Sequence, residues 1–168
     1  MGKRQIPPLA GERVRLRLLE EADLPRTLAW RNQEHIRRWF VHSDVITPEQ
    51  HRRWFERYRE RDDDFVFLIE EAPAARRPVG QVSLYGIDWA RRRAEYGRLM
   101  IGPPDATGRG LAREATRVLI DYATTTLGLR EIELDVVADN AAALALYTAC
   151  GFRAQDRPGP LVHMVRTV

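Results

Sequence analysis

A glycine-containing loop between a predicted strand and a predicted long helix constrains the fold of this chain most strongly. The loop is GPPDATGRGLA (102–112), with AEYGRLMI (94–101) before it and LAREATRVLIDYATTTLG (111–128) as the helix. Glycines at alternate positions, Gly108 and Gly110, allow a tight turn that exposes consecutive backbone N–H groups. The positive end of the helix dipole adds to them. This arrangement predicts a site for a phosphate or pyrophosphate.

The elements predicted around this loop define the fold class. Alternating apolar and polar residues and turn residues indicate strands at 13–20, 64–71, 79–88, 94–101, 130–137 and in two C-terminal segments, FRAQD and LVHMVRTV. Helices are expected over 21–40, 47–61, 111–127 and 140–149. The long helix should make the fourth and fifth strands parallel neighbours. We therefore expect a single α/β (α+β) domain over residues 1–168, with about seven mostly antiparallel strands and four helices.

Composition and charge narrow the functional classes. The chain has 168 residues, of which 44% are hydrophobic and 30% charged, as is typical of a soluble globular domain. Its net charge of +3 comes from arginines that are interleaved with acidic residues, so we expect no nucleic-acid partner. No apolar run approaches the ~20 residues of a membrane span, and no apolar signal segment follows the N-terminus. We expect a cytoplasmic protein with no membrane partner.

The cysteine and histidine content argues against a metal site. Cys150 is the only cysteine, and the four histidines lack the spacing of metal ligands. We therefore expect no metal ion and no internal disulfide.

Two common phosphate loops do not fit the glycine loop. A Walker A loop ends in Gly-Lys-Ser/Thr, which Arg109 and Leu111 do not supply. A dinucleotide-binding loop has a third glycine, where this chain has Arg113, and it follows the first strand rather than the fourth. TGRGLA (107–112) instead matches the Gly-x-Gly-x-Ala part of an acyl-CoA loop.

A second motif supports the acyl-CoA interpretation. VVADNAAALALYTACGFR (136–153) contains Asn140, then Tyr147 seven residues later, then a Gly-Phe pair. With both motifs in this order, nearly the whole chain resembles the GNAT superfamily of acyl-CoA N-acyltransferases. It is similar to the branch that includes ribosomal-protein N-terminal and nucleotide-amino-sugar N-acetyltransferases. Thr107 stands where the family usually has Arg or Gln, so the loop would depend on its backbone donors.

The resemblance implies direct transfer of an acetyl group from acetyl-CoA to an amine. It implies that the fourth and fifth strands splay apart and that the pantetheine arm pairs with the backbone of Leu99, Met100 and Ile101. The pyrophosphate would lie on the loop N–H groups, which belong to Gly108, Arg109, Gly110, Leu111 and Ala112. Asn140 would contact CoA, begin its helix as the N-cap, or do both.

Tyr147 is the expected general acid. The resemblance assigns it the protonation of the departing CoA thiolate, a task that suits a phenol. The alternative is that Tyr147 belongs only to the apolar face of its helix.

Glu95 is the expected base. Strand alternation would place it on the same face as Leu99 and Ile101, where apolar neighbours favour a raised pKa. The alternative is a solvent-facing residue that pairs with an arginine. Three roles are open for Asp135. It could attract the acceptor ammonium, act as the base through a water molecule, or be an ordinary solvated strand residue.

The acceptor site is expected on the segment between the first two strands and on the hairpin before the glycine loop. Its candidate residues are Trp30, Arg31, Asn32, Trp39, Tyr85 and Asp135. For the tryptophans, packing between two helices is the alternative. We expect the acceptor to be a small amine-bearing metabolite, such as a nucleotide-linked amino sugar. The alternatives are a protein N-terminus and a module that binds CoA without turnover. We expect a monomer or a homodimer.

Overall fold

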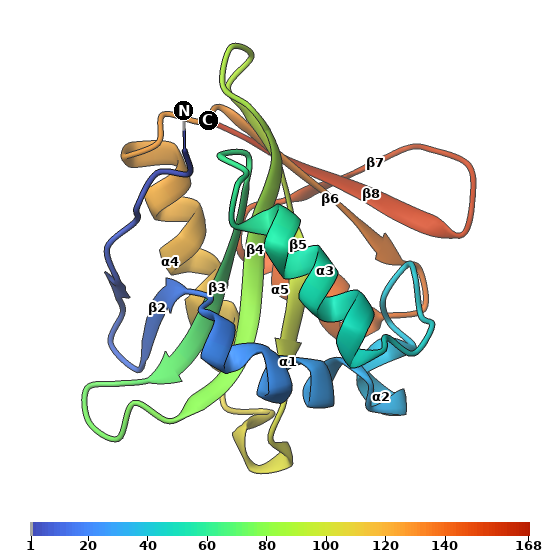
Figure 1. The fold of residues 1–168 in the computed structure, drawn as a ribbon. Helices are drawn as coiled ribbons and strands as arrows, with labels where there is room; N and C mark the ends of the chain where they lie inside the picture. Colours follow the sequence, from blue (N-terminus) through green and yellow to red (C-terminus); the bar gives the residue numbers. More distant parts are fainter. Residues whose placement is uncertain (1) are drawn as a thin grey trace.

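An eight-stranded sheet forms the centre of the molecule and carries helices on both faces (Figure 1). The computed structural model describes residues 2–168. The strands are β1 (Leu9–Ala10), β2 (Val14–Leu18), β3 (Asp64–Glu71), β4 (Pro78–Asp88), β5 (Arg93–Ile101), β6 (Glu131–Val137), β7 (Arg153–Gln155) and β8 (Leu161–Thr167). Their order is β1-β2-β3-β4-β5-β6-β8-β7. Adjacent strands are antiparallel except β5 and β6, which are the expected parallel neighbours. The short β1 is the strand that the sequence pattern did not predict.

Two groups of helices cover the two faces of the sheet. The first group consists of α1 (Leu24–Arg31), α2 (Glu34–Arg37) and α3 (Pro48–Tyr58), and the second of α4 (Leu111–Thr125) and α5 (Ala141–Ala149) (Figure 1). Two 3₁₀ turns precede α1 and α4, namely η1 (Glu21–Asp23) and η2 (Pro104–Ala106). Between residues 2 and 168, no helix has both the length and the apolarity to cross a membrane.

The single helix expected over 21–40 is wrong. This segment forms η1, α1 and α2, because Gln33 has an extended backbone with ψ of 133°. The side chain of Asn32 accepts from the N–H of Ile46 at 2.8 Å and donates to its C=O at 2.7 Å. These two hydrogen bonds tie the connection between α2 and α3 to the end of α1.

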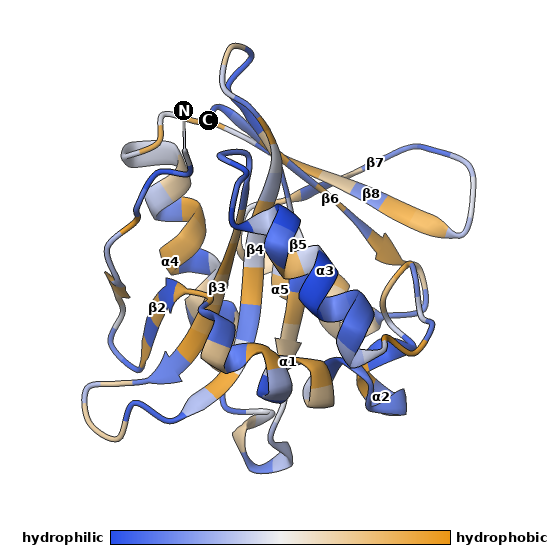
Figure 2. Ribbon diagram, in the orientation of Figure 1, coloured by the Kyte–Doolittle hydropathy of each residue, from blue (hydrophilic) through white to orange (hydrophobic). Residues whose placement is uncertain are grey.

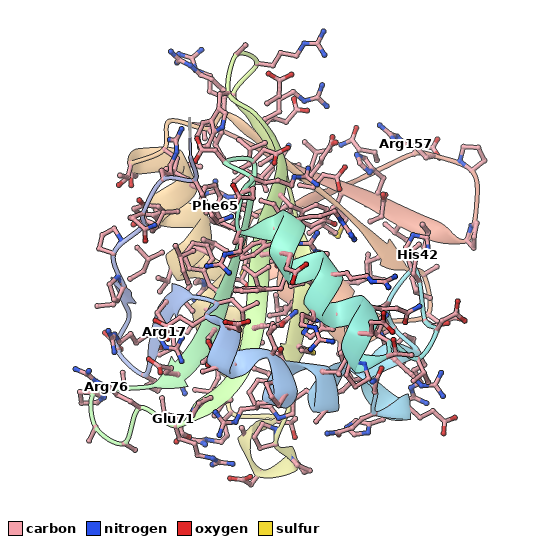
Figure 3. The ribbon with its side chains drawn as sticks, viewed as in Figure 1. Arg17, His42, Phe65, Glu71, Arg76 and Arg157 are labelled. Carbon is pink, nitrogen blue, oxygen red and sulfur yellow. The ribbon has the colours of Figure 1, made fainter. Side chains whose placement is uncertain are left out.

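Buried apolar residues hold each helix group to its face of the sheet. The first seven residues of β3 are buried, with Phe65 and Phe67 in the core beneath α4 and Val66 in the cluster beneath α3. Orange segments alternate with white and blue ones along the central strands, whereas the outer surface of α3 is mostly blue and therefore polar (Figure 2). On the edge beside β3, Arg17 (labelled in Figure 3) donates to Asp23 at 2.8 Å and to Glu70 at 3.0 Å. These ion pairs fix the start of α1 against β2 and β3.

The functional part of the fold is the point where β5 and β6 separate. Only three residue pairs join these strands, and the last is Glu95 with Glu133. On the other edge of β5, Gly97 faces Ser83 and Met100 faces Gln81, so β5 has one residue more than β4 between these pairs. Arg98 lies in this bulge with a φ of 54°. The expected splay of the parallel pair is thus present, and a bulge accompanies it.

The bulge reverses the alternation of side chains along β5. Glu95 and Gly97 lie on the face that carries α3, opposite the buried Tyr96. Beyond the bulge, Leu99 and Ile101 pack with the core on the α4 and α5 side. The expectation that Glu95 shares a face with Leu99 and Ile101 is therefore wrong, because simple alternation does not allow for an inserted residue.

An ion pair holds the bulge in place. Nη1 of Arg98 donates to Oδ1 of Asp64 at 2.7 Å, and the Asp64 side chain is only 4% exposed. A non-glycine residue with positive φ is costly unless its surroundings favour it, and this pair provides a favourable contact.

Replacing Asp64 should destabilise the fold far more than replacing its neighbour. We expect Asp64→Ala to lower the free energy of unfolding by about 2 kcal/mol, because it leaves a half-buried guanidinium unpaired. The matched control is Asp63→Ala, which removes an equally short but exposed pair with Arg61 at 2.8 Å and should cost less than about 1 kcal/mol. Urea denaturation of both variants measures the difference. Equal losses would show that Asp64 and Arg98 do not hold the bulge.

Candidate active site

A cavity of about 1080 Å³ occupies the gap between β5 and β6. Its lining includes β5 from Glu95 to Ile101 and β6 from Glu133 to Val136. It also includes residues from both helix groups, such as Trp39 after α2 and Tyr147 on α5. The cavity therefore connects the two faces of the sheet through the place where the strands part.

The glycine loop follows Ile101, the last residue of β5 that lines this cavity, and leads into the N-terminus of α4. Gly108 and Gly110 have φ of 73° and 78°, as the expected tight turn requires, and Gly110 is the N-cap of the 15-residue helix α4. Within residues 2–168, no backbone acceptor pairs with the amides from Gly108 to Arg113. These donors and the helix dipole are what the predicted anion site requires, and anion binding at the loop stays a prediction.

Side-chain contacts fix the shape of this loop. Arg109 donates to Glu71 (labelled in Figure 3) at 2.8 Å, and the carbonyl of Arg109 accepts from Arg13 at 2.7 Å. The Arg109 side chain is therefore directed toward the end of β3. Thr107 donates to the carbonyl of Pro104 at 2.7 Å, so its hydroxyl closes the η2 turn. Anion binding at this loop is left to the backbone amides.

Tyr147 and Asn140 lie on the α5 side of the cavity. The ring of Tyr147 makes edge contacts with Tyr96 and Phe152, each at 5.8 Å between centroids. Burial raises the pKa of Tyr147 well above its usual value, so its hydroxyl is protonated at neutral pH. Asn140 accepts from the amide of Ala143 at 3.2 Å, which makes it the N-cap of α5.

Acidic and basic groups gather on the opposite face of the gap. Glu95 lies beside Tyr85 on β4 and Glu133 on β6, and no arginine forms an ion pair with it within the described residues. Burial, followed by the charge of Glu95, raises the pKa of Tyr85 to about 12. Next to Glu133, the side chain of Asp135 lies 2.8 Å from Nδ1 of His163 on β8.

The structure brings together four of the six residues expected to bind the acceptor. Arg31, Trp39, Tyr85 and Asp135 line the cavity. Trp30 does not, because it is buried with Ile36, Leu68 and Met100 and lies against the backbone of Gly102. Asn32 does not either, because both ends of its amide bind Ile46.

Comparison with known proteins identifies the family. The model of the acetyltransferase (GNAT) domain matches residues 13–153. This chain belongs to the GNAT acetyltransferase family. The spermidine N(1)-acetyltransferase of Vibrio cholerae is 28% identical over 137 residues, which cover 82% of this chain and 77% of that protein. The Drosophila melanogaster α/β-tubulin N-acetyltransferase 9 is 29% identical over 156 residues, covering 86% and 77%.

A solved structure has the same fold as this GNAT acetyltransferase. The spermidine N-acetyltransferase of Vibrio cholerae, in complex with CoA and spermine, aligns with a TM-score of 0.83 at 25% identity and covers 92% of this chain and 95% of that one. The same Vibrio cholerae protein is also known as a dodecamer. The oligomeric state of the present chain stays a prediction.

This GNAT domain is an N-acetyltransferase that uses acetyl-CoA. The cavity residues and the loop fit that substrate, because β6 does not pair with β5 beyond Glu95 and the loop amides have no acceptor among residues 2–168. No group of three or more metal-ligating side chains is present among residues 2–168.

Sequence reasoning missed two groups at the centre of the site. Glu133 and His163 line the cavity beside the expected Asp135. Their proximity depends on the pairing of β6 with β8, in which Asp135 faces His163. The alternation of REIELDVV and LVHMVRTV indicated two strands, but it did not indicate their register.

Two glycine substitutions should separate acetyl-CoA binding from backbone strain. Gly108 lies in the loop and Gly128 lies after α4, both have positive φ, and no atom lies within 4 Å of the added Cβ at either. Each alanine variant should lose about 1 kcal/mol of stability. We expect only Gly108→Ala to weaken acetyl-CoA binding, by about 5-fold or more. The backbone at residue 108 would relax away from positive φ, and the loop N–H groups would then no longer point toward the pyrophosphate.

Calorimetric titration with acetyl-CoA measures this difference, and Gly128→Ala is the control. Unchanged affinity in Gly108→Ala would show that the loop does not hold the pyrophosphate.

Proposed function

We propose that this acetyltransferase acts on the primary amine of a small metabolite that also carries an anionic group. A nucleotide-linked amino sugar has this combination. The observation that supports the proposal is an unsatisfied hydrogen-bond donor of Arg31 in the cavity. Arg31 is buried, and its Nη1 has no hydrogen-bond partner within the described residues.

The guanidinium of Arg31 forms no ion pair with an acidic side chain among residues 2–168. Its Nη2 donates to the carbonyl of His42, which lies on the connection between α2 and α3 (Figure 3), and its Cζ lies 4.3 Å from the centroid of the Phe40 ring. Burial, followed by the charge of Arg37, lowers the pKa of Arg31. A buried cation with an unsatisfied donor is unfavourable, and an anionic group of the acceptor would satisfy it.

The acidic face of the gap supports an amine at the other end of the acceptor. Glu95 is free of ion pairs and would hold the ammonium and take its proton. Backbone groups of Leu99, Met100 and Ile101 would hold the thioester of acetyl-CoA beside that amine. After the C–N bond forms and the C–S bond breaks, Tyr147 would donate its phenolic proton to the thiolate. The burial that makes the phenol a weaker acid also makes a neighbouring thiolate a stronger base.

A polyamine is the second candidate acceptor. Three carboxylates, of Glu95, Glu133 and Asp135, line one part of the cavity and would attract a second ammonium. The Vibrio cholerae relatives are named for spermidine, and one was solved with spermine. Arg31 is the feature that separates the two candidates, because its charge opposes a polycation.

A matched pair of acceptors tests the anionic requirement. Glucosamine and glucosamine 6-phosphate offer the same amine without and with a phosphate. We expect the phosphate to raise kcat/KM by about 10-fold or more, since a charge-assisted hydrogen bond contributes about 1.5–3 kcal/mol. Arg31→Gln should abolish that preference while it lowers the rate with glucosamine much less. CoA release measures both rates.

Three outcomes would contradict the proposal. Spermidine as the better acceptor would favour the polyamine candidate, and a peptide with a free N-terminus as the better acceptor would favour a protein substrate. An equal loss with both sugars in Arg31→Gln would show that Arg31 serves only to hold the carbonyl of His42.

Tyr147→Phe should reduce turnover without affecting acetyl-CoA binding. We expect kcat to fall about 100-fold, which is a common value for the loss of a general acid, because the thiolate must then take its proton from water. The matched control is Tyr122→Phe on α4, outside the cavity, which should keep full activity. Thermal unfolding with and without acetyl-CoA confirms that binding is retained. Full activity of Tyr147→Phe would exclude this residue as the acid.

A further inference from the structure

His163 is a buried histidine in which only one of the two ring nitrogens has a hydrogen-bond partner among residues 2–168. His163 is 6% exposed and lines the cavity. Nδ1 lies 2.8 Å from Oδ1 of Asp135, whereas Nε2 is buried and has no hydrogen-bond partner among residues 2–168. Nothing in the expected acid and base roles of Tyr147 and Glu95 uses this side chain.

The contact with Asp135 determines which nitrogen carries the proton. An ionised carboxylate only accepts hydrogen bonds, so Nδ1 must be the donor. In the neutral imidazole, Nε2 then presents a lone pair to the cavity. Oε2 of Glu133 lies 3.6 Å from Nε2, and an ionised carboxylate cannot donate to this lone pair. A proton on Nε2 would turn this unfavourable contact into an ion pair.

Two carboxylates of β6 lie next to the ring of His163. Asp135 and Glu133 on β6 flank the ring, and Glu133 also accepts from Arg93 on β5 at 3.1 Å. Glu133 is the cross-strand partner of Glu95, so both carboxylates lie on the same face at the point where β5 and β6 part. Glu95, Glu133 and His163 thus lie on one face of the neighbouring strands β5, β6 and β8, and His163 also contacts the Asp135 carboxylate, whose side chain is 51% exposed.

We propose that His163, oriented by Asp135, is the end of a proton relay that removes the proton of the acceptor ammonium. The ammonium loses one proton to Glu95, and the proton passes through Glu133 to Nε2 of His163. The free amine then attacks the thioester carbonyl, the C–N bond forms and the C–S bond breaks. The thiolate takes the Tyr147 proton, and Tyr147 recovers one from the attacking nitrogen. The imidazolium releases its proton to solvent, so each acetyl transfer liberates one proton.

The relay rests on the acetyl-transfer activity but not on the identity of the acceptor. His163 acts through Glu133 and Glu95, so it is a positioning and relay residue rather than one that contacts substrate. An imidazole suits this task because it changes charge near neutral pH and therefore holds the proton better than an ordinary carboxylate.

The pH dependence of turnover tests the relay. His163→Gln keeps a side-chain amide that can bond Asp135 but cannot take up a proton. We expect about a 100-fold fall in kcat near neutral pH, with unchanged acetyl-CoA affinity and partial recovery at higher pH, where free amine is available from solution. Asp135→Asn should cause a smaller fall in kcat with the same dependence on pH. Asp139→Asn, an exposed acid outside the cavity, is the control and should keep the wild-type profile.

A second measurement needs no turnover. Nitrogen-15 NMR of the unmodified protein should show His163 with the proton on Nδ1 and a free Nε2 at high pH. If no amine were acetylated, the proposed acceptor would fail while this measurement still tests the relay. A proton on Nε2 in the neutral ring, unchanged kcat in His163→Gln, or an equal loss at every pH would each overturn the proposal.

Discussion

The separation of β5 from β6 is the constraint on which the rest of the site depends. The two strands pair over only three residues, and immediately beyond them Arg98 bulges out with positive φ while its guanidinium binds the buried Asp64. A parallel pair that continued along the sheet would satisfy the edge of β5 and close the cavity. Because the pair ends, the β5 backbone becomes available to a ligand, and the two faces of the sheet communicate through the gap.

The two faces then divide the chemistry between them. On the side of α4 and α5, the loop amides would hold an anion without help from Thr107 or the Arg109 side chain, and Tyr147 stays protonated because it is buried. The other face holds the carboxylates of Glu95, Glu133 and Asp135, together with His163 and Arg31, whose Nη1 has no hydrogen-bond partner among residues 2–168. One face would thus hold the acyl donor, and under the proposed function the other would hold the acceptor.

Local sequence signals predicted the parts of the fold that local interactions determine. The Gly108 and Gly110 turn, the helix expected over 47–61 and the parallel strands around α4 all follow from short motifs, and the structure has the turn, the helix α3 and the parallel pair. The orientation of Leu99 and Ile101 was wrong, because the inserted residue in β5 is stabilised by Asp64, a residue distant in sequence.

The same limit applies to the site. Trp30 looked like an acceptor contact and is a core residue, because Gly102 leaves room for its ring. His163 is one of the four histidines without metal-ligand spacing, and only the pairing of β8 with β6 brings it to Asp135. The roles of the site residues stay predictions until they are tested.

Amide hydrogen exchange with and without CoA tests the central claim most directly. If the β5 edge and the α4 N-terminus hold the acyl donor, CoA should slow exchange in residues 97–101 and 108–113 and leave β2 and β3 unchanged, because only the former amides lack protein acceptors or border the gap. Protection confined to other segments, or none at saturating CoA, would contradict the account.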